Sequence, residues 1–193
     1  MAKDYKTVLE NASDEFVEKR SRFIGYCKPV KTEQEAIDFI NEKRSEHWNA
    51  THNVYAYSLR EGNIKRYSDD GEPSGTAGMP VLDVIVKNEI FDVVVVVTRY
   101  FGGVLLGTGG LVRAYSKAVQ EGLAASTVIL KQKGIILQVT TDYTGIGKIQ
   151  YIAGERSLPV LDSEYTDRVV LKLLVPVQES GSVEKAITEG TNG

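Results

Sequence analysis

Residues 99–115 combine side chains and spacing that could bind an anion. Five glycines lie between Arg99 and Arg113, and an apolar pattern with helical spacing follows them. Glycine lets an anion approach the backbone closely, and a helix that begins after such a loop presents free amides. We therefore predict an anion or nucleic-acid site with the two arginines as clamps. Its other members are Tyr100, Gly102, Gly103, Gly107, Gly109 and Gly110.

The same glycines have a second explanation. They could allow only a tight crossover and close packing of a helix on a sheet, with the arginines paired to local carboxylates. The spacing matches neither the P-loop nor the dinucleotide fingerprint. Both explanations remain open at this point.

A polar loop over residues 68–80 offers a different chemistry. Asp69, Asp70 and Glu72 could bind a hard cation such as magnesium or act as acid and base. The alternative is a solvated acidic turn, with Ser74 or Thr76 capping the helix that follows. A hydrolase triad would have to recruit a histidine from a distance, and a histidine beside an aromatic residue is more often a packed side chain.

Positive charge also gathers at residues 19–31. The side chains are Lys19, Arg20, Arg22, Lys28 and Lys31. This face could contact phosphate groups, and we include Arg20 and Arg22 among the candidate binding residues. A solvated strand surface screened by Glu15 and Glu18 explains the pattern equally well.

The surrounding pattern predicts the elements that position these residues. The uninterrupted valines at 93–97 predict a central strand covered on both faces, and a helix is expected from Thr108 or Gly109. Extended pieces are expected within 15–30 and over 53–60 and 64–67. Thr32 and Glu35 form a capping box for a helix that reaches Trp48.

Composition excludes several classes of protein. The 193 residues are 42% hydrophobic and 25% charged, with a formal net charge of −3, so a broad basic surface is excluded. Cys27 is the only cysteine, so we expect no internal disulfide. One cysteine and two histidines are too few ligands for a structural zinc site. We also expect no cofactor. No long apolar run indicates export or membrane insertion, and a cytoplasmic location is the default expectation.

The pattern of apolar and polar residues changes in the last third of the chain, after a linker at 131–134. Strands are expected at 135–141, 160–165 and 168–175, with helices at 145–156 and from Val183. This β-α-β-β-α order predicts a ferredoxin-like domain without its final strand. We expect either an exposed sheet edge, inviting weak self-association, or a disordered tail at Asn192 and Gly193. The predicted domains are residues 1–130 and 135–193 of an α+β protein.

Three segments together closely resemble the IMPACT and YigZ family. They are His47-Trp48-Asn49-Ala50-Thr51-His52-Asn53, the loop from Asp69 to Pro80, and the stretch from Thr98 to Tyr115. The resemblance implies a first domain similar to the second domain of ribosomal protein S-five and to domain four of elongation factor G. It also implies a second domain similar to domain five of that factor. The family's eukaryotic branch is associated with translational control, through a protein partner of an amino-acid-sensing kinase.

Two functions remain for test. The first is a non-enzymatic, translation-linked protein whose first domain binds RNA, the ribosome or a translation-associated protein. The second is a magnesium-dependent hydrolase or phosphotransfer enzyme that uses the acidic loop for catalysis and the glycine loop as an anion cradle. The resemblance brings no catalytic residues with it, so we favour the first.

Overall fold

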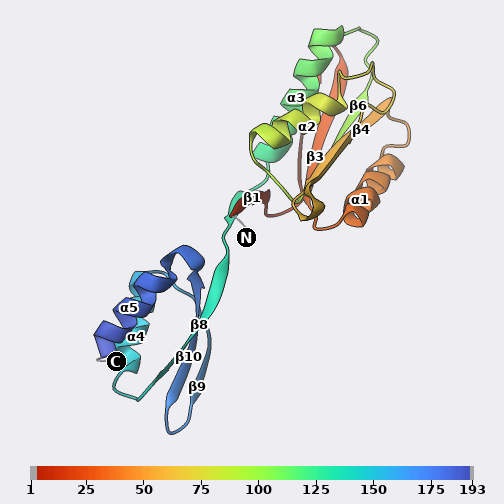
Figure 1. Cartoon of the computed structure of the whole chain (residues 1–193). Coiled ribbons are helices and arrows are strands. Elements are labelled where there is room, and N and C mark those ends of the chain that lie inside the picture. Colours follow the sequence, from red (N-terminus) through yellow and green to blue (C-terminus); the bar gives the residue numbers. More distant parts are fainter. Residues whose placement is uncertain (1–3, 192–193) are drawn as a thin grey trace. The chain divides into compact units, whose positions relative to one another are not determined.

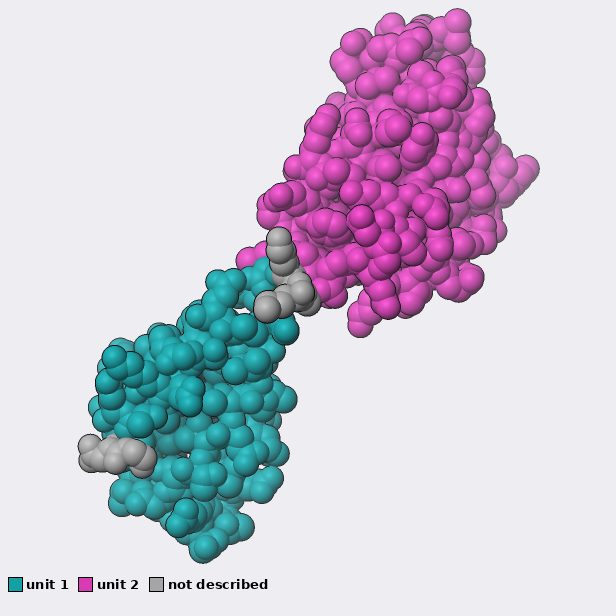
Figure 2. Space-filling model, in the orientation of Figure 1, with its two compact units in different colours: residues 1–4, 132–193 teal, residues 5–131 magenta. Residues whose placement is uncertain are grey.

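A computed structural model describes residues 4–191, which form two compact units (Figure 2). One unit is residues 5–131, and the other joins Asp4 to the chain from residue 132 onward. The sequence places the boundary between residues 130 and 135, and the units divide between 131 and 132. Both units mix helices with antiparallel strands, so the protein is α+β.

The first unit is built on a five-stranded sheet of order β2-β3-β6-β4-β5, in which every neighbouring pair is antiparallel. The central strand holds the valine run, and Val93 to Val97 are at most 1% exposed. The prediction of a strand covered on both faces is therefore confirmed. The strands are β2 (Ala12–Glu18), β3 (Ser21–Pro29), β4 (His52–Leu59), β5 (Ile64–Ser68) and β6 (Val93–Tyr100).

Helices cover both faces of this sheet (Figure 1). Helix α1 (Glu33–Glu46) packs on one face, and α2 (Gly78–Lys87) and α3 (Thr108–Ala124) pack on the other. The Thr32 hydroxyl accepts from the Glu35 amide, as the capping box predicts. The helix ends at Glu46, so the expectation that it reaches Trp48 is wrong.

One short sheet was not expected from the sequence. Strands β1 (Tyr5–Val8) and β7 (Val128–Lys131) pair in antiparallel register, with Tyr5 opposite Lys131. Lys131, assigned to the linker, therefore belongs to a strand. The 3₁₀ turn at Glu61–Asn63 connects β4 to β5, which correspond to the extended pieces expected over 53–60 and 64–67.

The second unit contains its five main elements in the predicted order. They are β8 (Gly134–Thr141), α4 (Ile146–Glu155), β9 (Val160–Tyr165), β10 (Val169–Pro176) and, after a 3₁₀ turn at Val177–Glu179, α5 (Ser180–Thr191). The sheet order is β8-β10-β9, which is the ferredoxin-like order without its fourth strand. Residues 192 and 193, where a disordered tail was the alternative, lie outside the described residues. None of the helices within residues 4–191 is long and apolar enough to cross a membrane.

Candidate functional site

Four connections meet at one end of the five-stranded sheet, which we call the loop end. Strand β6 finishes there while β3 and β4 begin there, since Arg22 pairs with Tyr100 and His52 pairs with Arg99. The connections are the β2–β3 turn at 19–20, the loop at 47–51, the acidic loop at 69–77 and the glycine loop at 101–107. The two loops that the sequence singled out therefore lie together.

A buried ion pair joins the acidic loop to the strand that precedes the glycine loop. Arg99 is 5% exposed, and its Nη1 donates to Glu72 Oε1 at 2.5 Å. The Tyr115 hydroxyl donates to the same oxygen at 2.7 Å, and burial raises the pKa of this hydroxyl, so it remains a donor. Arg99 thus has an internal partner, and our interpretation of it as an open anion clamp is corrected.

Asp69 caps helix α2 from a distance. Its Oδ1 accepts from the amides of Ala77 at 3.1 Å and Gly78 at 2.8 Å, and its Oδ2 accepts from Gly75 at 2.9 Å. The expected cap from Ser74 or Thr76 is wrong, since the Thr76 hydroxyl donates to the Pro73 carbonyl instead.

The third acidic side chain is also held by internal donors. Asp70 accepts from the Asn53 amide at 2.7 Å and from Arg44 Nη2 at 2.8 Å. Within residues 4–191 no three His, Cys, Asp or Glu side chains are grouped so that they could hold a metal. The proposed acidic residues therefore hold the fold together, and their geometry gives the magnesium-dependent alternative no support.

The glycine loop is shaped by three different requirements. A Cβ on Gly102 would lie 2.0 Å from the Arg20 backbone, so this glycine lets the loop rest on the β2–β3 turn. Gly103 and Gly107 adopt φ of +80° and +72°, which side chains rarely tolerate. A Cβ on Gly110 would meet Leu106 at 3.1 Å. Much of the glycine pattern is thus architectural.

Helix α3 nevertheless begins with exposed residues. Gly107 is its N-cap residue, and no side chain within the described chain caps it. Thr108 and Gly109, the first two helical residues, are exposed. The amides of a first turn carry partial positive charge and lack intrahelical partners. An anion could therefore be accepted at this end of α3, and the predicted anion site stays a prediction.

Basic side chains lie beside the first turns of this helix. Lys19 and Arg20 form a two-residue turn with φ of 45° and 65°, and Arg113 and Lys117 project from α3. We call these four exposed side chains the basic rim. Three of them line a shallow pocket of about 230 Å³. The pocket residues are Phe16, Glu18, Lys19, Leu106, Gly110, Arg113, Ala114 and Lys117.

The partners of these cations differ. Lys117 lies 3.5 Å from Glu121, a solvent-exposed pair that contributes little. Among residues 4–191, Arg113 and Arg20 form no ion pair. Arg22 is exposed but pairs with Glu15 at 2.5 Å, and its guanidinium lies 5.8 Å from the centre of the Tyr100 ring. Arg20 and Arg113 are thus the candidates best placed to meet a ligand.

No functional role was predicted for Trp48, which is 82% exposed. Its loop is held firmly, because the Thr51 amide donates to the Arg99 carbonyl and the Phe101 amide donates to the Thr51 hydroxyl. The preceding His47 is packed as expected, within hydrogen-bond distance of the Tyr26 and Tyr100 hydroxyls at 2.6 and 2.8 Å. Burial lowers the pKa of His47. Only the structure could show that the neighbouring indole faces solvent.

These features define a two-unit α+β protein with a cationic loop end and no assembled catalytic group among the residues predicted for one. Residues 19–123, more than half of the chain, match the Impact N-terminal domain, and residues 139–193 match a domain of unknown function (DUF1949). The chain belongs to the IMPACT family.

Individual relatives agree with this assignment. The chain is 43% identical to IMPACT family member YvyE of Bacillus subtilis (strain 168), over 100% of this chain and 89% of the relative. It is 30% identical to IMPACT family member YigZ of Escherichia coli (strain K12), over 91% of this chain and 87% of the relative. A crystal structure described as that of a hypothetical protein is similar, with 28% identity and a TM-score of 0.65, covering 100% of this chain and 95% of the other.

Proposed function

We propose that the protein is a non-enzymatic, translation-linked regulator in the cytoplasm whose first unit binds RNA through the loop end. One observation carries the proposal. The basic rim places Lys19, Arg113 and Lys117 around one pocket beside the first turns of α3, where Glu18 is the acidic lining residue. Asp69, Asp70 and Glu72 of the acidic loop are held by internal donors. Local positive potential can therefore act on a phosphate although the whole chain carries a net charge of −3.

The geometry favours single-stranded or irregular RNA over a regular duplex. Only a few cations are available, so contacts to the phosphate backbone must be few and local. Trp48 presents an exposed indole from a loop at the same end of the sheet that Thr51 ties to the backbone, and unstacked bases pack on such rings without strong sequence preference. The link to translation comes from the resemblance to the eukaryotic branch of the family. A translation-associated protein bound at the same end is the competing result.

The test is co-sedimentation of the purified protein with ribosomes, together with titration of a single-stranded RNA at several salt concentrations. Arg20→Ala/Arg113→Ala removes the two rim arginines that have no ion pair. Because each phosphate contact contributes about 0.7 to the salt slope of single-strand binding, we expect the slope to fall by roughly 1 to 1.5 and affinity to fall at least about tenfold.

The matched control is Arg66→Ala/Arg156→Ala, which removes equal charge from exposed positions outside the loop end. This variant should bind as the wild type does. Unchanged ribosome and RNA binding by the rim variant would refute the proposed contact. If the rim variant loses ribosome binding while neither the wild type nor the variant binds free RNA measurably, the partner at the loop end is a protein and not RNA.

A further inference from the structure

The loop end exposes a second aromatic ring besides Trp48. Phe101, the first residue after β6, is 45% exposed, and Trp48 on the neighbouring connection is 82% exposed. Folded proteins bury most of their phenylalanine side chains, so two exposed rings at one end of a sheet are an informative exception. The contacts proposed above involve Trp48 and the rim arginines and leave Phe101 unused.

The backbone that carries the Phe101 ring is fixed on both sides. Its own amide donates to the Thr51 hydroxyl at 3.0 Å, and the Gly102 amide donates to the Ser21 hydroxyl at 3.2 Å. Thr51 directly precedes β4 and Ser21 begins β3, and these two strands are the neighbours of β6 in the sheet. The ring is therefore attached to backbone that both neighbouring strands hold in place.

The Phe101 ring also contacts a buried cation. The guanidinium carbon of Arg99 lies 5.4 Å from the centre of this ring and 5.4 Å from the centre of the Phe23 ring. Arg99 is itself held by hydrogen bonds to Glu72 and Ser21. A guanidinium group attracts the face of an aromatic ring, so this contact orients Phe101 and leaves its exposed part to solvent.

A cation with no ion pair among the described residues lies directly beside this ring. A Cβ on Gly102 would lie 2.0 Å from the Arg20 backbone, so the turn that carries Arg20 is packed against the residue that follows Phe101. Arg20 is exposed. A flat ring next to a cation matches the two parts of a nucleotide, because the base stacks on the ring and the phosphate meets the charge.

We propose that Phe101 and Trp48 each stack one base of a single-stranded RNA segment, with a phosphate next to the Phe101-bound base on Arg20. This inference rests on the function proposed above and adds a second base contact to it. Arg99 is a positioning residue, since it holds the Phe101 ring from the protein side through its own ion pair with Glu72. A ring that is already held in place loses little freedom when a base stacks on it, which favours binding.

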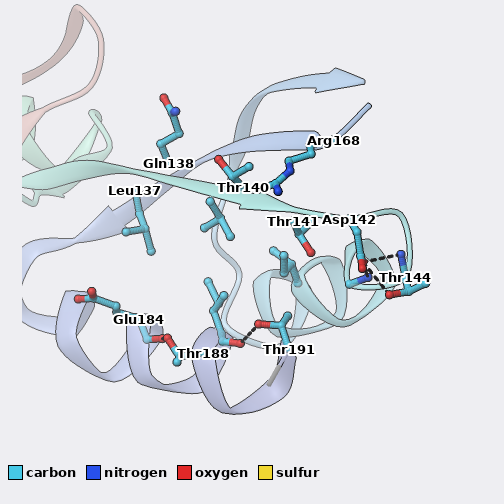
Figure 3. A pocket seen from close by; sticks show the side chains of 14 residues that line it. Leu137, Gln138, Thr140, Thr141, Asp142, Thr144, Arg168, Glu184, Thr188 and Thr191 are labelled. Carbon is cyan, nitrogen blue, oxygen red and sulfur yellow. Dashed lines mark hydrogen bonds between the residues drawn. The ribbon is translucent and has the colours of Figure 1, made fainter. Parts of the chain in front are cut away.

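The cavity of the second unit does not suit the same ligand. It measures about 530 Å³, and Figure 3 shows Asp142, Arg168 and Glu184 among its lining side chains. These are the charged residues of its lining, so two carboxylates face one cation there. A polyanion is repelled by such a surface, and the basic rim of the first unit is the better place for it.

The experiment titrates the full chain with a single-stranded RNA octamer of mixed sequence. Phe101→Leu keeps an apolar side chain but removes the flat ring, so binding should weaken by about fivefold to a hundredfold, the range for one base stacked on an aromatic side chain. The salt dependence should stay that of the wild type, because the phosphate contacts remain. Phe101→Tyr keeps a ring and should bind within about twofold of the wild type.

Two variants serve as controls. Tyr165→Leu removes a ring that is 54% exposed in the second unit, and Leu105→Ala shortens an aliphatic side chain of the glycine loop that is 80% exposed. Both should bind the octamer as the wild type does, because neither removes a ring from the loop end.

Trp48 provides an independent signal. It is the only tryptophan of the chain, so tryptophan fluorescence reports on this ring alone. The octamer should quench the emission because a base stacks on the indole, whereas inorganic polyphosphate, which has charge but no bases, should leave it unchanged.

The outcomes separate this inference from the proposed function. Wild-type affinity in Phe101→Leu would overturn the inference and leave the rim contact, tested by Arg20→Ala/Arg113→Ala, intact. An equal loss in Phe101→Tyr or Leu105→Ala would also overturn it, because the contact would then not be with the face of the ring. Quenching of Trp48 by polyphosphate as strong as that by RNA would do the same. A wild-type chain that binds neither RNA nor ribosomes would refute the proposed function itself.

Discussion

The Glu72 carboxylate shows how a residue suited to chemistry can instead organise a site. Its sequence context suggested a metal ligand or a catalytic acid. In the structure, Arg99 and Tyr115 both donate to its Oε1, and the side chain is 4% exposed. The pair connects the acidic loop to β6 and α3, so it fixes the base on which the exposed loops rest.

Removing the Glu72 carboxylate should lower the free energy of unfolding far more than breaking a solvent-exposed ion pair would. In Glu72→Ala the Arg99 guanidinium stays buried without its partner, and its Nε already lacks an acceptor within the described chain. We expect the free energy of unfolding to fall by about 3–5 kcal/mol, measured by urea denaturation. Glu61→Ala, at an exposed position of the same unit, should change it by less than about 0.5 kcal/mol.

A double variant separates the cost of an orphaned charge from the worth of the pair. Glu72→Leu/Arg99→Met removes both charges and should lose less stability than Glu72→Ala alone, because no buried ion is left unpaired. If the single and double variants lose the same amount, packing and not electrostatics explains the effect.

At the scale of elements, close contact between α3 and β3 positions the open end of α3. A Cβ on Gly25 of β3 would lie 2.1 Å from the Ala118 carbonyl oxygen of α3. A Cβ on Gly122 would lie 2.8 Å from the Gly25 carbonyl. Two glycines on facing elements therefore allow the helix to lie directly on the sheet.

Gly25→Ala should push α3 away from the sheet. The clash is with backbone, which cannot rotate away as a side chain can, so we expect a loss of about 1–3 kcal/mol and weaker RNA binding at the displaced helix end. Gly147→Ala is the matched control, since nothing lies within 4 Å of its Cβ position inside α4, and alanine there should stabilise by about 0.5–1 kcal/mol. A neutral Gly25→Ala variant would show that the contact is not tight in solution.

The elements that the sequence predicted are those with a strong local signal. The valine run predicted β6, and the capping box predicted the start of α1. Alternating or helical spacing of apolar residues predicted the elements of the second unit. Strands β1 and β7 were not predicted, because each has only four residues and its partner strand lies more than a hundred residues away in the sequence. Their pairing depends on tertiary structure, which no local pattern records.

The site was predictable in part for the same reason. Glycine spacing indicated the loop before α3, and residue type indicated its cations. Whether a charged side chain already has a partner depends on contacts between segments that are distant in the sequence. The contact of Arg99 with Glu72 is one of these, and it shows that Arg99 belongs to a structural ion pair and is not an open anion clamp. The exposure of Trp48 is likewise a property of the folded loop.

At the scale of the whole molecule, each unit has its own core. Two hydrophobic clusters lie between Val8 and Leu123, one on each face of the first sheet, and a third lies between Leu137 and Ile187. Every one of these clusters belongs to a single unit. Stability should therefore be divided in the same way, which has consequences for how the proposed RNA contacts can be tested.

We expect a core substitution in one unit to leave the hydrogen-exchange protection of the other unit unchanged. Leu171→Ala removes a side chain that is 1% exposed in the second core, and Leu59→Ala removes one that is 2% exposed in the first. Each should destabilise its own unit by about 2–5 kcal/mol, because the cavity is only partly refilled. Hydrogen exchange followed by mass spectrometry resolves the two units in the full chain. Parallel loss of protection in both units after either substitution would mean that they unfold together, and effects on RNA binding could then not be assigned to the first unit alone.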